Sequence, residues 1–292
     1  MRILYSVDIP VSYVTQFSSN VHLLAEQRYS RLLPAVMREQ GTGESGAIEI
    51  TGGIDAPNEI NERHGDTPLN STPQTRRWWF MKDYDVADLI DKQDRVKMLI
   101  QLDSIYTMRH AGTMGRGMDD AIIDALYRTA VTGHTGSGTT AFPTASQQLA
   151  SGSTGLTIDK LNRAKEILDA NEVDEFYPRF FAATSRQMRE LLEDDKVTSQ
   201  DFNTVKALVQ GQVDTFLGFK FIRTERLIST SSVRNCFAWA QPAIRFIDGM
   251  APNTTASPRP DKRYAQQIYT CGSWTAVRTE DEMVVSVLCS EA

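Results

Sequence analysis

The chain has 292 residues, of which 41% are hydrophobic and 23% charged, as expected for a folded protein of one large domain or two modest ones. A net charge of -6, from 31 basic and 37 acidic residues, argues against a protein that grips nucleic acid over its whole surface. The chain has no apolar run of membrane-span length, no long apolar start typical of a signal peptide, and three cysteines without metal-ligand spacing, so we expect a soluble, cytoplasmic product with buried, reduced thiols.

The first 92 residues predict an arm followed by a long hairpin. Residues 1–45 show only weak helical spacing, broken at Pro34, which indicates an extended arm with one helical piece. Residues 46–92 contain two segments of strand character, "GAIEITG" and "TRRWWFMKDYDV", joined by the polar stretch 53–74. Polar connections of this length are unusual in compact domains and are usually functional. We therefore expect an extended hairpin with a functional tip.

A helical region is predicted next, over residues 83–131. An unbroken helix over 103–131 would be roughly 43 Å long. Asp119 and Asp120 suit the positive end of a helix dipole, and Gly133 suits a C-terminal cap.

Three glycines lie in the middle of this predicted helix, within "AGTMGRG". Each glycine costs about 1 kcal/mol relative to alanine in a helix interior. The helix is therefore either bent there or held straight by its neighbours. The three positions are Gly112, Gly115 and Gly117.

The second half of the chain predicts a connector and then a mixed unit of helices and strands. Residues 132–157 contain no charged side chain and are expected to be a flexible connector. Helix and strand patterns alternate over 158–222, and two strands are expected within 233–250. Residues 251–264 have the composition of a turn-rich surface loop. The last stretch, 274–292, is expected to be a β-hairpin.

One glycine-rich stretch comes close to a nucleotide-binding loop. "GHTGSGTT", Gly133–Thr140, fits the phosphate-binding pattern except that Thr139 stands where a lysine is required. Such a loop also needs a strand before it and a helix after it. Here a helix is expected before it and a flexible segment after it. The glycines are better explained as the end of a helix and the start of a connector.

Other patterns of catalysis and metal binding are missing from the sequence. The four histidines lack the i, i+4 spacing of a zinc-binding helix, and no Gly-x-Ser-x-Gly elbow occurs. We therefore expect no catalytic residue, no metal site, no cofactor and no enzymatic activity.

The stretch "RRWWF" concentrates side chains that bind other macromolecules. Tryptophan and arginine stack on nucleic-acid bases, but they are also enriched where proteins contact proteins. The negative net charge favours protein contact over nucleic acid. The candidate intersubunit contacts are Arg76, Arg77, Trp78, Trp79 and Phe80.

The order of these parts resembles the major capsid protein of tailed bacteriophages, the Hong Kong 97 fold, over nearly the whole chain. "SIYTMRHAGTMGRGMDDAIIDALYRTAVTG" resembles the spine helix of that family running into a glycine turn. "FYPRFFAATSRQMRELLED" and "GQVDTFLGFKFIRTERL" resemble its strand–helix segment and a later strand. The resemblance rests on the order of the segments and on their residue patterns rather than on one invariant motif. It implies an α+β fold.

The resemblance implies a division of the chain into four parts. The parts would be an N-terminal arm that reaches another subunit (1–45), an extended loop that lies over a neighbour (46–92), a peripheral domain with spine helix 103–131 (93–157 and 271–292), and an axial domain gathered at fivefold and sixfold centres (158–270). The glycines of the spine helix would then be hinges that let it bend in an immature shell and straighten on expansion.

The implied function is structural. The chain would self-assemble through pentamers and hexamers into an icosahedral shell around double-stranded DNA, in the virion, after assembly in the host cytoplasm. Scaffolding, portal and decoration proteins would be its partners, with packaged DNA held without sequence-specific contacts and no membrane involved. Covalent cross-linking through a loop lysine is not implied, because no lysine occurs between Ala47 and Met81.

Two other functions stay open at this point. An encapsulin-like nanocompartment has the same fold but encloses a cargo enzyme. A nucleotide-dependent enzyme would use Gly133–Thr140.

Overall fold

The computed structural model describes residues 27, 29–53, 59, 63, 71–91, 102–193 and 215–291. The predicted helical piece before Pro34, the tip of the hairpin and the helical segments at 92–101 and 198–211 lie wholly or largely outside these residues. No helix in the described ranges is long and apolar enough to cross a membrane.

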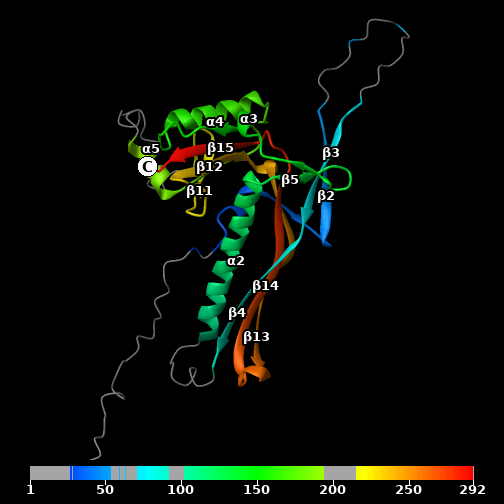
Figure 1. The fold of residues 1–292 in the computed structure, drawn as a ribbon, viewed down its shortest axis with the longest axis vertical. Helices are drawn as coiled ribbons and strands as arrows, with labels where there is room; N and C mark the ends of the chain where they lie inside the picture. The colour runs from blue at the N-terminus through cyan, green and yellow to red at the C-terminus, as the bar shows by residue number, and fades with distance from the viewer. Residues whose placement is uncertain are drawn as a thin grey trace, which may run out of the picture.

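An elongated four-stranded sheet carries the longest helix along its length (Figure 1). Its order is β1 (Met37–Gln40), β13 (Ile244–Arg259), β14 (Ala265–Arg278) and β4 (Lys82–Ile90). Strands β13 and β14 form a long antiparallel hairpin, and β1 pairs with β13 in parallel. Helix α2 (Leu102–Tyr127) packs against β14 and β13. Apolar α2 side chains such as Ile122 share a buried cluster with Trp274 of β14, and His110 Nδ1 lies 3.0 Å from Thr270 Oγ1 of the same strand. Tertiary packing therefore contributes to the position of the helix.

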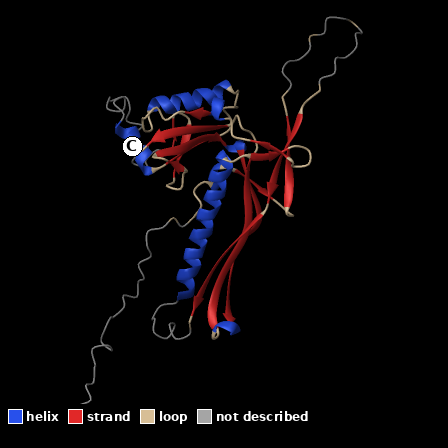
Figure 2. Cartoon of the chain, viewed as in Figure 1, coloured by secondary structure: helices blue, strands red, loops and turns tan. Residues whose placement is uncertain are grey.

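A seven-stranded sheet forms the other end of the molecule. Its path is β7 (Gln148–Leu149), β15 (Val284–Ser290), β12 (Val233–Ala240), β8 (Arg179–Ala183), β10 (Phe219–Arg223) and β9 (Thr215–Phe216), with β11 (Ser229–Thr230) beside β12. Helices α3 (Thr144–Gln147), α4 (Ile158–Ala170) and α5 (Ser185–Glu193) lie around it (Figure 2). Every residue of β8 is buried, which agrees with the apolar run at 180–183 that follows the buried Arg179.

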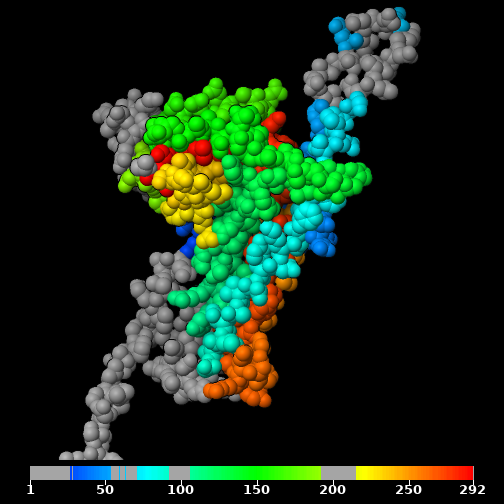
Figure 3. Space-filling model, in the orientation of Figure 1, coloured from blue at the N-terminus to red at the C-terminus, as the bar shows by residue number. Residues whose placement is uncertain are grey.

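The third sheet contains the hairpin predicted near the N-terminus. Its order is β2 (Ser45–Thr51), β3 (Gln74–Phe80), β5 (Ala130–Thr132) and β6 (Gly138–Thr140). The ends of β2 and β3 that lead to the tip project away from the rest of the molecule (Figure 3). One residue after β3, the chain enters β4 of the elongated sheet. The hairpin is therefore continuous with the sheet that carries α2.

A buried aspartate attaches the N-terminal segment to the middle of α2. The Asp119 carboxylate accepts hydrogen bonds from the backbone amides of Arg31 and Leu32 at 3.1 and 3.0 Å, from Ser30 Oγ at 2.6 Å, and from Gln27 Nε2. Since α2 begins at Leu102, the prediction that Asp119 and Asp120 occupy a helix start was wrong.

A buried lysine holds the segment before α4 against the last strand. Lys160 is 7% exposed, and its Nζ donates to four backbone carbonyl oxygens at 2.8–3.0 Å. Burial lowers the pKa of this ammonium from its ordinary value. The carbonyl groups belong to Ser151, Thr154, Gly155 and Leu288.

Several predicted elements are confirmed. The hairpin of β2 and β3, helices α4 and α5, strand β8 and the strand pair β9–β10 occur where their sequence patterns place them. Two strands also flank the short 3-10 turn Gln241–Ala243. Cys236 and Cys289 are buried free thiols, as expected, whereas Cys271 is partly exposed.

Other predictions were wrong for identifiable reasons. Helix α2 ends at Tyr127 rather than 131, because residues 130–132 pair with β3 and β6. Residues 86–90, expected to be helical, form strand β4 against β14. Strands β6 and β7 and helix α3 lie within the supposed flexible connector at 132–157.

The end of the chain also differs from the expectation. Strands β14 and β15 do not form a hairpin, because β14 pairs with β13 and β15 pairs with β12. Most of the supposed surface loop at 251–264 extends β13. Sheet membership therefore divides the chain differently from the expected domain ranges: 244–270 lies with α2, and 284–290 lies with the α/β unit.

Candidate subunit interface at the base of the hairpin

The five candidate contact residues on β3 face different surroundings. Trp79 is buried, 9% exposed, in a small cluster with Ile48, Ile247 and Val277. Its ring therefore joins the hairpin to the elongated sheet within one chain. This position leaves Trp79 little surface for a neighbouring subunit.

Arg77 is likewise engaged inside its own chain. Its Nη2 lies 2.6 Å from Asp281 Oδ2, and its Nε donates to the carbonyl oxygen of Thr279 at 3.1 Å. The other oxygen of Asp281 accepts from Arg278 Nε at 2.5 Å. One carboxylate thus connects two guanidinium groups, one from β3 and one from the end of β14.

The second guanidinium of this network caps the long helix. Arg278 Nη1 donates to the carbonyl oxygens of Leu126 and Arg128 at 3.1 and 2.8 Å, at the end of α2. The guanidinium carbon lies 5.3 Å from the centre of the Phe142 ring. Burial lowers the pKa of Arg278, and the Asp281 carboxylate opposes that shift. A cation at a helix C-terminus is favourable for the helix dipole, so the network also stabilises the last turn of α2.

The remaining three candidates are more accessible. Arg76 pairs with Glu49 across the hairpin, at 2.6 Å. Trp78 is half-buried, and its Nε1 donates to the carbonyl oxygen of Gly133 at 2.7 Å. Phe80 is 47% exposed. Of the five side chains, Phe80 is the large apolar group that this chain leaves open to solvent.

The glycine-rich stretch is the turn of a strand pair rather than a phosphate loop. It connects β5 to β6, and Gly133 and Gly136 adopt φ values of 92° and 73°, which favour glycine. The turn leads directly into strand β6, which forms the last three residues of the stretch, whereas a phosphate loop leads directly into a helix. The Trp78 hydrogen bond to Gly133 gives the turn a structural role instead.

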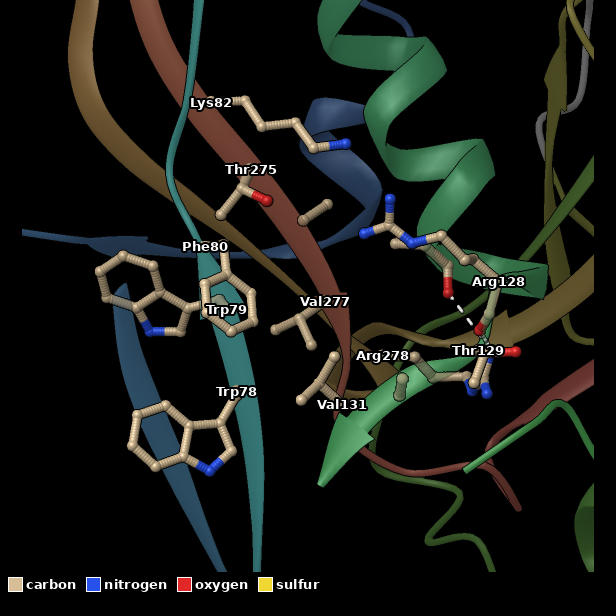
Figure 4. Close-up of a pocket in the computed structure, with 13 residues that line it drawn as sticks. Trp78, Trp79, Phe80, Lys82, Arg128, Thr129, Val131, Thr275, Val277 and Arg278 are labelled. Atoms are coloured by element: carbon tan, nitrogen blue, oxygen red, sulfur yellow. Dashed lines mark hydrogen bonds between the residues drawn. The ribbon is translucent and has the colours of Figure 1, made fainter. Parts of the chain in front are cut away.

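A hollow lies between β3, β4 and the end of α2 (Figure 4). Its volume is about 260 Å³. The lining contains Trp78 and Phe80 and three cations, Lys82, Arg128 and Arg278, but no acidic side chain. Arg128 pairs with Asp124 at 2.7 Å, whereas Lys82 has no ion pair with any described residue. The hollow is therefore cationic and partly aromatic.

The candidate hinge glycines lie in an uninterrupted helix. Gly115 is where the N-terminal segment touches α2, because a Cβ there would be 2.8 Å from the Ser30 backbone nitrogen. A Cβ at Gly117 would make an ordinary contact of 3.4 Å with the Trp274 ring. Gly112 is buried. Close backbone approach therefore accounts for Gly115, independently of any hinge.

These contacts predict opposite effects for two neighbouring alanine substitutions. Gly115→Ala should destabilise the fold by about 1–3 kcal/mol, because the new methyl group displaces the backbone at residues 29–30. Gly117→Ala should stabilise the fold by up to about 1 kcal/mol, because alanine favours the helix and fits the space. Thermal denaturation measures both effects, and tryptic cleavage at Arg31 should accelerate only in the first variant. Equal shifts would contradict this account of Gly115.

Several structurally important residues carry no recognisable sequence signal. Asp281 sits in the charged run "RTEDE", which has the composition of a solvated turn. Lys160 occupies a helix position that normally faces water. Among the described residues, no cluster of three or more His, Cys, Asp or Glu side chains could hold a metal ion.

Comparison with known proteins then identifies the family. Residues 9–291 match the family model described as phage capsid protein. The chain belongs to the phage capsid protein family. It is a major capsid protein and a component of the virion, as the resemblance in its sequence implied.

Solved capsid structures are similar to this capsid chain over almost their full length. The capsid of Ralstonia phage GP4 has a TM-score of 0.76 at 10% identity, covering 100% of this chain and 99% of that one. The cyanophage Pam1 capsid has a TM-score of 0.71 at 14% identity, with 97% and 98% covered. A chain from Mycobacterium phage Che8 has a TM-score of 0.70 at 17% identity, with 94% and 97% covered. No curated protein matches the chain. The predicted Hong Kong 97-like fold is confirmed.

Proposed function

We propose that this capsid protein assembles through pentamers and hexamers into a closed icosahedral shell that encloses the double-stranded DNA of a tailed phage. The family match over residues 9–291 carries the proposal. It favours a phage shell over an encapsulin-like compartment. Assembly would take place in the host cytoplasm, with scaffolding, portal and decoration proteins as partners and DNA held without sequence-specific contacts. The role would be structural, without catalysis.

The projecting hairpin supports a contact between subunits. A two-stranded hairpin is marginal in water, and the ends of β2 and β3 project away from the described body (Figure 1). We propose that 46–80 is the extended loop that lies on a neighbour. We also propose that 1–45 contains an arm that reaches another subunit, although its residues 30–32 and 37–40 are held by α2 and β13 of this chain. Arg76, Trp78 and Phe80 are the contact candidates with accessible side chains, whereas Arg77 and Trp79 would act by fixing the hairpin base.

The sheets suggest revised domain boundaries. We propose a peripheral domain that contains α2, β4 and the long hairpin 244–278, and an axial domain that contains 144–240 and 284–290. The axial domain would meet its copies at the fivefold and sixfold axes. Gly112, Gly115 and Gly117 remain candidate hinges for shell expansion. A chain with Gly112 and Gly117 replaced by alanine, which spares the close contact at Gly115, should then assemble but fail to expand.

Electron microscopy of the purified recombinant chain, with nucleic-acid absorbance read on the same fractions, tests the proposal. We expect closed shells or rings of five and six subunits, formed by the chain alone or with a co-expressed scaffolding protein. Nucleic acid in particles from infected cells distinguishes a genome container from a cargo compartment. A chain that remains monomeric under all of these conditions would overturn the proposal.

A further inference from the structure

The loop after helix α4 presents an isolated aromatic side chain to solvent. Phe176 is 90% exposed, far more than any other large hydrophobic residue in the described ranges except Tyr29, and Tyr177 beside it is 40% exposed. Single exposed apolar side chains are common on protein surfaces, but the adjacent rings of Phe176 and Tyr177 form an aromatic projection that a partner would stabilise by burying it. The loop is here named the acidic knob and consists of residues 172–177, "EVDEFY".

The acidic knob is held rigidly. The Asp174 carboxylate accepts the amide hydrogen of Phe176 at 2.9 Å, and its carbonyl oxygen accepts the amide hydrogen of Tyr177 at 3.3 Å. Arg179 is buried, donates to the carbonyl oxygen of Val173 at 2.9 Å and pairs with Asp169 at 2.5 Å. A loop whose backbone is fixed in this way loses little backbone entropy when a partner covers it, which favours the use of its aromatic side chain as an anchor.

The negative charge of the knob indicates what kind of surface would bind it. Glu172, Asp174 and Glu175 are all exposed, and the knob contains no basic residue. The backbone of another acidic residue, Glu282, lies beside it, since Asn171 Nδ2 donates to the Glu282 carbonyl oxygen at 3.0 Å. An aromatic ring surrounded by carboxylates fits a hollow that is apolar inside and cationic at its rim.

The hollow at the hairpin base has these properties. Lys82 supplies a cationic group, and Arg128 supplies another that is paired with Asp124. Trp78 and Phe80 supply aromatic surface, and no acidic side chain lines the hollow. Its volume of about 260 Å³ suffices for one ring, because a closed apolar cavity of about 150 Å³ holds a benzene molecule. Lys82 lacks an ion pair with any residue that the structure describes, so its charge is available to a partner.

We propose that the acidic knob of one copy of this chain docks into the hollow of a second copy, with Phe176 as the anchor and Glu175 facing Lys82. The two sites must come from different copies, because Phe176 is 90% exposed in its own chain. Contacts between two different patches generate rings when the rotation closes, which is the symmetry that pentamers and hexamers require. The inference rests on the proposed shell function and names one surface pair within it.

Charge reversal and its compensation test the contact. Glu175→Lys and Lys82→Glu should each lower the fraction of chain in shells at least tenfold, because like charges would then face each other. The double variant should recover most of the assembly, since the pair is restored in reverse. Both side chains are exposed, so all three variants should keep the thermal midpoint of the unassembled wild-type chain. Single variants that assemble normally, or a double variant no better than either single one, would overturn the pairing.

A second experiment tests proximity directly. A chain with Phe176→Cys and Phe80→Cys should form a ladder of disulfide-linked oligomers on mild oxidation of assembled shells, whereas each single variant should not. Phe176→Ser should also impair assembly, and the control Tyr264→Ser, at an aromatic residue that is 57% exposed, should not. Absence of the ladder in well-formed shells would overturn the contact and leave the shell function standing. If the unaltered chain formed no shells under any condition, both the proposed contact and the proposed shell function would be overturned.

Discussion

Replacing Asp281 with alanine is expected to lower the free energy of unfolding by about 3–5 kcal/mol, because the change leaves two guanidinium groups without their shared carboxylate. The side chains of Arg77 and Arg278 are 10% and 0% exposed, so water cannot replace the lost partner. The hairpin base and the end of α2 would lose a common anchor. Urea denaturation of the unassembled chain measures the effect.

An exposed ion pair nearby provides the control. Asp124 and Arg128 lie one turn apart on the surface at the end of α2, with side chains 50% and 46% exposed. Asp124→Ala should change the free energy of unfolding by no more than about 0.5 kcal/mol. Similar losses for Asp124→Ala and Asp281→Ala would show that burial of the network does not determine its contribution.

Replacing Lys160 with methionine is expected to destabilise the chain by about 2–4 kcal/mol, because four partly buried carbonyl oxygens lose the same ammonium donor together. Methionine has a similar length, so the loss would reflect hydrogen bonding rather than an empty space. Hydrogen exchange at the amide of Ser290 should also accelerate, since that amide donates to the carbonyl oxygen of Thr154 in the same segment.

The same substitution elsewhere on the helix is the matched control. Lys165 lies on α4, is partly exposed and is not among the residues that hold the segment 151–155. Lys165→Met should leave both the urea midpoint and the Ser290 exchange rate close to those of the wild type. If Lys160→Met proved as mild as Lys165→Met, the carbonyl cage would contribute little to stability.

The local pattern of apolar and polar residues predicted the helices and strands that bury one continuous face. The strands of the hairpin, the amphipathic helix α4 and the apolar strand β8 all follow from residues close in sequence. The sequence pattern did not predict which strands pair with each other. Strand β14 was expected to turn back on β15, but the turn at residues 260–264 pairs it with β13 instead. Residues 86–90 have helical spacing, and only the distant strand β14 makes them a strand.

The candidate interface was predicted in part for a related reason. Composition placed arginine and tryptophan side chains at the hairpin base, but it could not distinguish which of them the chain buries itself. Arg77 and Trp79 are buried because Asp281 and Val277, about 200 residues away in sequence, come to lie beside them. The acidic knob carried no signal either, since exposed Phe176 and buried Phe180 look alike in the sequence.

The elongated sheet has a consequence for the order of events during synthesis. Met37 of β1 pairs with Arg245 of β13, and Ile90 of β4 pairs with Gln266 of β14, so two of its four strands wait for partners near the other end of the chain. Contacts between residues so far apart in sequence form slowly, because a long loop must close before the strand pairing can stabilise the structure. A ribosome-bound chain that ends before residue 265 lacks β14, the partner of both β13 and β4, and one that ends before residue 278 lacks the Arg278 cap of α2. Incomplete chains would therefore be unable to enter a growing shell, which makes this topology a form of quality control over what is incorporated.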